Sequence, residues 1–340
     1  TAWLAVTYFM TAFVLEAFFT RNSFCMYVCP LGTFNFLYST ISPLQITSHN
    51  LDVCRDCQGH ECINGSATQQ GCQLELFVPT IQSNLNCTFC LDCVKACPYH
   101  NVALAMRAPG DELFRQSWRN RLDLAWLAVI AAFLALGNAF GMTPPVYALE
   151  QQLATLLQTQ SEAIVLGLIY VGGAVVGPLL LVYGAAWLSR SLTGRARSAE
   201  RSLNRLVMRY AYSFVPLGFA IWFAHYLFHF LTGGMTIVPA FQTFFQRTLA
   251  WPILGEPNWQ LAARFVPTAE TIQVLQSVIT YGGLLAALAL ALTTARKSRR
   301  DGRVALLEAL PWLVVLILLA VASGSTFLLP MEMRGSALGG

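Results

Sequence analysis

Six stretches of the chain carry almost only apolar side chains over about 20 residues, the length that a helix needs to cross a membrane. The charged share of the whole sequence is 11%, against about 25% in an ordinary soluble domain. The pattern therefore predicts a mainly α-helical membrane protein with about six transmembrane helices. The predicted spans are Ala2–Thr20, Leu122–Met142, Ala163–Leu188, Tyr210–Leu231, Thr271–Thr294 and Leu307–Leu329.

A polar insert, residues 46–121, separates the first two predicted spans. It is rich in turn residues, has no apolar run long enough to span, and holds eight of the ten cysteines. The apolar segment before it, Cys25–Pro43, is short and is interrupted by Pro30 and Gly32, which indicates an interfacial or half-inserted helix. We therefore expect three parts. They are residues 1–45 with one transmembrane helix and the interfacial segment, residues 46–121 as a cysteine-rich module, and residues 122–340 with five transmembrane helices.

Lysine and arginine collect in alternate loops, after the third and the fifth predicted spans. Short cytoplasmic loops carry an excess of these residues, so both loops are expected in the cytoplasm, and the polar insert with them. All of the 21 basic residues except Arg247, Arg264 and Arg334 then fall on one side, which is typical of membrane topology rather than of nucleic-acid binding. The two loops contain Arg190, Arg195, Arg197, Arg201, Arg205 and Arg209, and then Arg296, Lys297, Arg299, Arg300 and Arg303.

The second half of the insert contains a cysteine run that matches the bacterial ferredoxin pattern without a mismatch. Cys87, Cys90, Cys93 and Cys97 are separated by two, two and three residues, and Pro98 follows the last of them. In this pattern three thiolates hold one [4Fe–4S] cluster and the fourth reaches the neighbouring cluster. Zinc sites usually pair two C-x2-C elements across a longer gap, and cytoplasmic disulfides are rare, so neither alternative explains the run.

An earlier run has the same C-x2-C start but longer second and third gaps, and Gln73 stands where the proline would be. Two such starts, about 33 residues apart, indicate an internal repeat, as in a two-cluster ferredoxin-like α+β module. The usual crossover would assign the eight cysteines to two [4Fe–4S] clusters. One cluster would take Cys54, Cys57, Cys62 and Cys97, and the other would take Cys72, Cys87, Cys90 and Cys93.

Two further cysteines, Cys25 and Cys29, follow the first predicted span, and Pro30 comes next. Four residues apart, they would share one face of a helix. Two thiols cannot hold a cluster alone. The pair is therefore either buried as apolar side chains or part of an additional redox or metal centre.

The string from Arg21 to Gly32, RNSFCMYVCPLG, resembles the C-x3-C-P-L-G signature of membrane polyferredoxins of the NapH and NosR type. This resemblance covers about residues 1–112. The region from Leu122 on resembles the longer FesM-type membrane electron-transfer proteins, mainly through the string from Phe223 to Gly234. Proteins of this type generally carry two C-x3-C-P elements. We therefore expect a second element before Thr1, where it could complete a third metal centre with Cys25 and Cys29.

The resemblance implies an electron-transfer subunit of a quinol-linked oxidoreductase complex rather than a stand-alone enzyme. Such a protein lies in the bacterial inner membrane and links the quinone pool, or a membrane redox partner, to a cytochrome or reductase in respiration. A multihaem cytochrome c is the kind of partner that it implies. An alternative is a redox-sensing or maturation factor, with Cys25 and Cys29 as the working dithiol and the clusters as sensors.

His225 and His229 lie in the fourth predicted span, four residues apart and therefore on one face of the helix. Ionisable side chains inside a membrane are uncommon and tend to be functional. The pair could bind a quinone, ligate a haem b shared with a partner or with upstream sequence, or hydrogen-bond a neighbouring helix. The other histidines, His49, His60 and His100, lie in or beside the insert, so no second predicted span supplies a facing ligand.

Overall fold

The computed structural model describes residues 2–19, 22–116, 120–194 and 202–331. The chain divides into two compact units, Thr1–Asn120 and Arg121–Gly340. Each unit has its own core. Some of the basic residues on which the sequence analysis relied lie outside the described residues. They are Arg195, Arg197 and Arg201 of the first arginine-rich loop, Arg334, and Arg21, which begins the polyferredoxin-like string.

The first unit begins with an apolar helix, α1 (Ala2–Phe18), of 17 residues. At 1.5 Å per residue it is about 26 Å long, somewhat less than the hydrocarbon thickness of about 30 Å. Among the described residues five helices, all in the second unit, are long and apolar enough to cross a membrane, and α1 is a shorter apolar helix. The structure thus supports five of the six predicted spans by length and composition, and leaves the first below that length.

The predicted single helix over Cys25–Pro43 is wrong. Two short helices, α2 (Ser23–Tyr27) and α3 (Pro30–Tyr38), occupy this segment, and a 3-10 turn, η1 (Ser39–Ile41), follows them. A proline disfavours helical geometry at the residue before it, and Cys29 is accordingly extended, with ψ 119°. Pro30 itself suits the first position of a helix, because its missing N–H would have no partner there. Cys25 and Cys29 therefore do not share a face of one helix.

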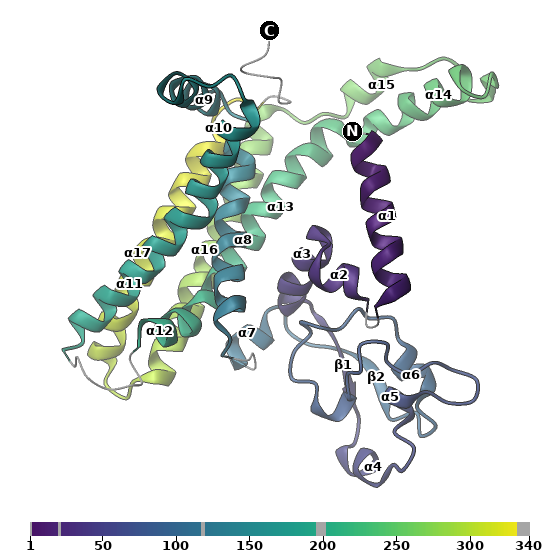
Figure 1. Cartoon of the computed structure of the whole chain (residues 1–340), viewed down its shortest axis with the longest axis vertical. Coiled ribbons are helices and arrows are strands. Elements are labelled where there is room, and N and C mark those ends of the chain that lie inside the picture. Colours follow the sequence, from purple (N-terminus) through teal and green to yellow (C-terminus); the bar gives the residue numbers. More distant parts are fainter. Residues whose placement is uncertain (1, 20–21, 117–119, 195–201, 332–340) are drawn as a thin grey trace. The chain divides into compact units, whose positions relative to one another are not determined.

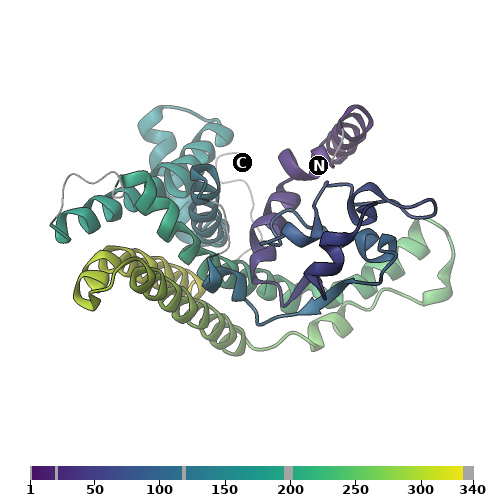
Figure 2. The same cartoon turned by 90° about the horizontal axis from the view of Figure 1, so that it is seen from below.

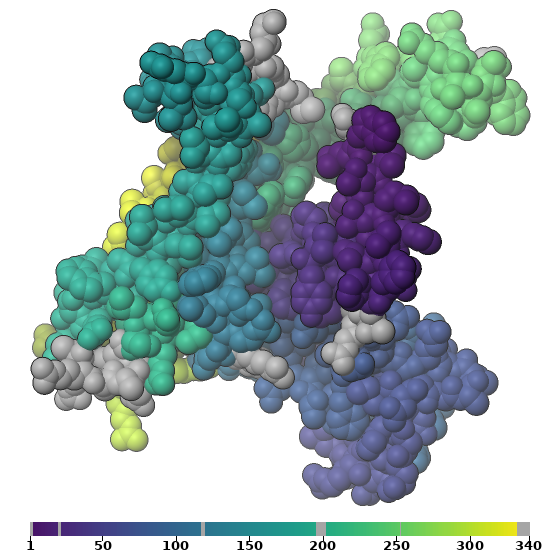
Figure 3. All heavy atoms as spheres, viewed as in Figure 1, coloured from purple at the N-terminus to yellow at the C-terminus, as the bar shows by residue number. Residues whose placement is uncertain are grey.

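The insert is closed by two antiparallel strands, β1 (Leu44–Ser48) and β2 (Val102–Met106), paired so that Ile46 lies opposite Leu104. All eight cysteines of the insert lie between these strands in the sequence. Figure 3 shows the insert, in blue, as a compact body. The segments between the strands are short helices joined by turns: α4 (Leu51–Asp56), α5 (Glu61–Asn64), η2 (Val78–Thr80) and α6 (Asp92–Ala96), and α7 (Asp111–Arg115) follows β2.

A buried carboxylate, Glu112, holds the base of the insert together. It accepts hydrogen bonds from Arg107 Nη2 at 2.9 Å, from the backbone N–H of Asn84 at 2.9 Å, and from the Ser83 hydroxyl. The Asn84 side chain donates in turn to the carbonyl of Leu44, where β1 begins. A buried ion pair of this kind is stable only when its remaining hydrogen-bonding groups are satisfied, as they are here.

The second unit is a bundle of long helices, of which α8, α11, α13, α16 and α17 run side by side (Figure 1). Figure 2 shows the same helices from below. Three of the long helices are single elements: α8 (Leu122–Phe140), α16 (Ala269–Ser298) and α17 (Gly302–Phe327). A further helix consists of α10 (Glu162–Tyr170), a π-helical turn, η3 (Val171–Val176), and α11 (Gly177–Leu192). Another consists of α12 (Leu203–Tyr210), η5 (Ala211–Ser213) and α13 (Phe214–Gly233). The shorter helices that connect them are α9 (Pro144–Leu157), α14 (Ile237–Arg247) and α15 (Trp259–Arg264).

A second buried carboxylate, Glu308 of α17, lies at the arginine-rich end of this bundle. Its side chain is 1% exposed and pairs with Arg209 at 3.2 Å and with Arg299 at 2.6 Å. The Tyr210 hydroxyl donates to it at 3.3 Å, and Ser189 of α11 donates to its backbone carbonyl at 2.7 Å. The loops that the sequence assigned to one side of the membrane therefore meet at one end of the bundle.

Replacing Glu308 by alanine should destabilise the second unit, because Arg299 and Arg209 would lose the charge that compensates them. We expect the free energy of unfolding to fall by about 3–5 kcal/mol. Reversible denaturation of the protein in mixed micelles measures this change. The exposed Glu256 is the matched control, and Glu256→Ala should change the value by no more than about 0.5 kcal/mol. Equal effects of the two substitutions would contradict the assignment.

Candidate functional site

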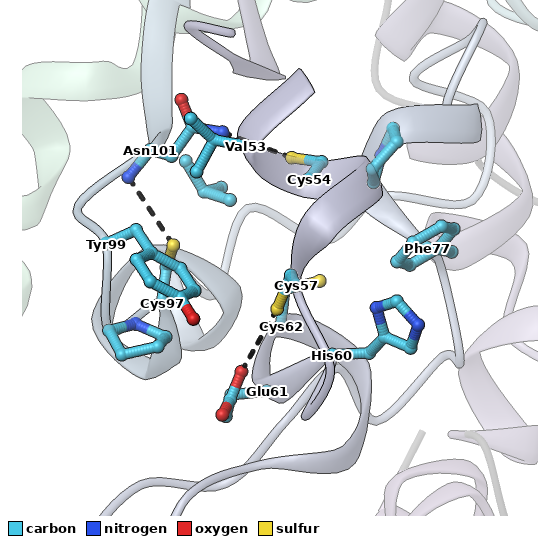
Figure 4. Close-up of a pocket in the computed structure, with 13 residues that line it drawn as sticks. Val53, Cys54, Cys57, His60, Glu61, Cys62, Phe77, Cys97, Tyr99 and Asn101 are labelled. Carbon is cyan, nitrogen blue, oxygen red and sulfur yellow. Dashed lines mark hydrogen bonds between the residues drawn. The ribbon is translucent and has the colours of Figure 1, made fainter. Parts of the chain in front are cut away.

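The eight cysteines of the insert lie in two separate pockets. Four of them line the first, which is drawn in Figure 4, together with apolar and polar side chains that include Phe77 and Asn101. The other four line the second, with Ile46, Leu76 and Phe89 among its walls. The first set is Cys54, Cys57, Cys62 and Cys97, and the second is Cys72, Cys87, Cys90 and Cys93. These are the two sets into which the ferredoxin crossover divides the sequence, and their binding of iron stays a prediction.

Cys97 reaches the first pocket although it belongs to the same cysteine run as the residues of the second. It follows the last residue of α6, and Pro98 follows it. The proline forces an extended backbone at Cys97, with ψ 112°, so the helix ends and the chain turns away from Cys93. Cys57 ends α4 with a similar extended geometry, at ψ 121°. Short helices that stop at a cysteine thus place these sulfurs at the pocket walls.

Several residues beside the cysteines have a left-handed backbone although they are not glycine. Such a conformation costs about 1–3 kcal/mol for each residue, and it clusters at functional sites where surrounding structure enforces it. In the loops around Cys72 and Cys87 the resulting turns aim backbone N–H groups at sulfur. Leu76 N–H donates to Cys72 at 3.4 Å, and Phe89 N–H donates to Cys87. The left-handed residues near the cysteines are His60, Glu75, Phe89, Leu91 and His100.

In both pockets burial disfavours the deprotonated form of a cysteine. Burial, with the negative charges of the neighbouring Cys72, Cys87 and Cys90, raises the pKa of the Cys93 thiol to about 12. Burial likewise raises the pKa of Cys62. Four deprotonated cysteines in such a pocket would need a cationic group between them. A [4Fe–4S] core, which is held by four thiolates, fits this donor set, and the pocket walls supply the N–H groups that such sulfurs accept.

Asn101 is a polar residue that sequence reasoning missed. It is 6% exposed and lies directly against the first pocket, as Figure 4 shows. Its Nδ2 donates to Cys54 Sγ at 3.1 Å and to the Asn50 carbonyl at 2.7 Å, while its backbone N–H donates to Cys97 Sγ at 3.4 Å. One residue thus joins the first and the last cysteine of the set, Cys54 through its side chain and Cys97 through its backbone N–H. No local motif reveals it, because Cys54 is 47 residues away in the sequence.

Replacing Asn101 by aspartate should lower the reduction potential of one centre and leave the other unchanged. The change removes a donor to Cys54 and places an acid beside the pocket, which disfavours the more negative, reduced state. Hydrogen bonds to charged groups contribute about 1.5–3 kcal/mol, which corresponds to about 60–130 mV for one electron. A redox titration followed by electron paramagnetic resonance measures the shift.

The matched control for this experiment is Asn64→Asp, the same chemical change at an exposed position of α5. Asn64 donates to the Gly59 carbonyl and to no cysteine. Equal shifts in both variants, or equal shifts of both centres in Asn101→Asp, would contradict the role of Asn101.

Cys25 and Cys29 line neither pocket. Cys25 lies in α2 and is exposed, and Cys29 precedes α3 and is buried. Their sulfurs nevertheless interact, although the two residues are not on one helix face. The sequence singled out this pair, and the structure places it beside Tyr8 of α1, whose hydroxyl lies 2.7 Å from Cys29 Sγ.

His225 and His229 lie on one face of α13, as predicted. Their Nε2 atoms are 3.2 Å apart, and their rings are nearly perpendicular. His225 is 1% exposed, and its Nδ1 has no hydrogen-bond partner among the described residues. The facing helix α16 contributes Gln276, which is buried and donates to the carbonyl of Ala224. A buried imidazole with an unused nitrogen is suited to bind a ligand or a further polar group.

No family model matches the sequence, and no solved structure matches it. The chain is similar to a protein of Escherichia coli (strain K12) named “Putative electron transport protein YccM”. The two are 29% identical over 89 residues, which are 26% of this chain and 23% of the relative. The match thus spans about a quarter of the relative's length. What the comparisons add is a similarity, over part of the chain, to a protein named for electron transport.

Proposed function

We propose that this chain is a membrane-bound iron–sulfur protein that transfers single electrons through two [4Fe–4S] clusters. The observation that carries the proposal is the separation of eight cysteines into two pockets of four, each with N–H donors and apolar walls. The similarity to a protein named for electron transport fits this role. Five helices long and apolar enough to cross a membrane fit a multi-pass protein.

The residues of the two pockets have distinct tasks in this proposal. The cysteines hold the clusters, which supply one-electron chemistry when bound. Hydrogen bonds from Asn101, Leu76 and Phe89 to the sulfurs favour the reduced state, and thereby set the potential. The apolar side chains around them, among them Val78 and Val102, exclude water and keep the clusters from hydrolysis.

The membrane region anchors the cluster module at the bilayer in this proposal. We propose that the arginine-rich end of the bundle faces the cytoplasm of a bacterial inner membrane, with the cluster module on the same side. The protein then links the quinone pool or a membrane redox partner to a cytochrome or reductase, as the resemblance to NapH- and NosR-type polyferredoxins implies. His225 and His229 would bind the quinone or a haem b shared with a partner subunit.

Iron analysis tests the two-cluster proposal. Protein purified without oxygen should contain about eight irons and eight acid-labile sulfides per chain, because each cubane holds four of each. Cys87→Ser should reduce both values by about half, since it removes a ligand from the second set only. The control is Cys25→Ser, which lies in neither set and should retain about eight irons. Fewer than about eight irons in well-loaded wild-type protein would overturn the proposal.

Optical spectroscopy separates the two roles of the histidine pair. A haem b ligated by His225 gives a sharp α-band in the reduced-minus-oxidised spectrum of the intact complex, and His225→Ala should abolish it. If no such band is present, the haem role is excluded. Protection of the residues around His225 from hydrogen exchange by a bound quinone analogue then tests the quinone role. The acid-labile sulfide content should be the same in His225→Ala and wild-type protein in both cases, because a haem contains none.

A further inference from the structure

The segment after α1 brings together three side chains that the two cysteine pockets do not use. Tyr8 comes from α1, Cys25 from α2, and Cys29 from the residue that caps α3. The ring of Tyr8 packs edge-on against Phe24, with 5.0 Å between the ring centroids, and this contact directs its hydroxyl toward Cys29. The site is therefore built by packing between helices rather than by one sequence motif.

The surroundings of Cys29 favour a negatively charged sulfur. The side chain accepts hydrogen bonds from the Tyr8 hydroxyl at 2.7 Å and from the Gly32 N–H at 3.2 Å. It also lies at the amino end of α3, a helix of nine residues whose dipole stabilises an anion there. Although burial acts to raise the pKa of Cys29, the hydrogen bonds from Tyr8, Gly32 and Leu31 outweigh it and leave the pKa lowered.

Cys25 is held close to Cys29 by an approach that only glycine permits. A Cβ added at Gly32 would lie 1.9 Å from the carbonyl oxygen of Cys25, so any other residue would push α2 away from α3. Cys25 differs from Cys29 in two respects. It is exposed, and burial together with the neighbouring charges of Cys29 and Glu16 raises its pKa. One sulfur of the pair is thus open to solvent, and the other is sheltered among groups that stabilise a negative charge.

We propose that Cys25 and Cys29 form a dithiol–disulfide redox couple in which the Tyr8 hydroxyl stabilises the reduced Cys29 sulfur. The exposed Cys25 can meet an exchange partner, and the Cys29 sulfur, whose negative charge its surroundings stabilise, can then attack the mixed disulfide at Cys25. The hydrogen bonds at Cys29 also distinguish the pair from two inert apolar cysteines, whose packing does not depend on such bonds.

The couple exchanges two electrons and two protons. On oxidation the S–S bond forms, and the two sulfurs pass two electrons and two protons to a disulfide of an exchange partner, whose own S–S bond breaks to give a dithiol. On reduction the S–S bond breaks, and each sulfur gains one electron and one proton. Two reduced [4Fe–4S] clusters would supply the electrons, one each, and this supply rests on the proposed function. Iron–sulfur clusters reach potentials below those of many dithiol–disulfide couples, so reduced clusters can reduce a disulfide.

A thiol titration of the whole protein tests the couple without depending on the clusters. The protein in detergent is equilibrated without oxygen in buffers of reduced and oxidised dithiothreitol, quenched with acid, unfolded and alkylated. Cleavage after Arg21 and before Asp52 yields residues 22–51, in which Cys25 and Cys29 are the only cysteines. Mass spectrometry should show this segment passing from doubly alkylated to internally disulfide-bonded in one two-electron step. Full alkylation of both thiols in the most oxidising buffer would overturn the proposal.

Two tyrosine variants test the part that Tyr8 plays. Tyr8→Phe keeps the ring against Phe24 and removes only the hydroxyl, so the reduced state loses one hydrogen bond. The ratio of disulfide to dithiol in a fixed buffer should rise about tenfold, which is a shift of about 30 mV to more negative potential. Tyr27→Phe makes the same change at an exposed side chain between the two cysteines and should leave the ratio unchanged. An equal ratio of disulfide to dithiol in the two variants would contradict the proposed role of the Tyr8 hydroxyl.

The two proposals fail in different ways. If the segment 22–51 shows the two-electron step but the iron content is low, the couple stands and the cluster assignment falls. If the iron content is about eight and the segment never forms a disulfide, the clusters stand and the couple falls.

Discussion

A proline after a cysteine is the local constraint on which both proposed redox sites of this protein depend. The proline ring disfavours helical geometry at the preceding residue, so Cys29 and Cys97 are both extended. At Cys97 the constraint ends α6 and sends the sulfur to the pocket of Cys54 rather than to that of its own run. At Cys29 it starts α3 with the sulfur at the positive end of the helix. The same Cys-Pro dipeptide thus directs Cys97 to the pocket of the other cysteine run and places Cys29 where a negative charge on its sulfur is stabilised.

The second theme of the structure is the compensation of buried charge. Glu112 and Glu308 are both almost inaccessible to solvent, and both are neutralised by arginine and by further donors. The cysteine pockets contain no such arginine among the residues that line them in the described structure. Their thiolates must be compensated by something else, and a metal–sulfur core is the group that matches four converging cysteines. The contrast between these two kinds of buried anion separates the structural sites from the proposed redox sites.

The two units also have different roles in the proposed electron-transfer function. The first concentrates the groups that can change oxidation state, in short helices and turns whose strained residues hold sulfur in place. The second consists of long helices whose arginine-rich loops meet at Glu308. In the proposed function the first unit holds the electrons and the second anchors it in the bilayer.

The sequence by itself determined the features that depend on neighbours along the chain. Apolar runs of about 20 residues identified the spans, and arginine-rich loops correctly indicated which helix ends lie together. Cysteine spacing divided eight residues into the two sets that line the two pockets. The sequence showed Pro30 as an interruption of the interfacial segment, but the pair Cys25 and Cys29 was still expected on one helix face, and the structure places the two residues on either side of the break. Only the tertiary structure decided the roles of Tyr8, Asn101 and Glu308. Each acts on a residue distant in the sequence, 21 positions away for Tyr8 and Cys29 and 99 for Glu308 and Arg209. Such pairs leave no period or spacing in the chain, because it is packing between elements that brings them within hydrogen-bonding distance.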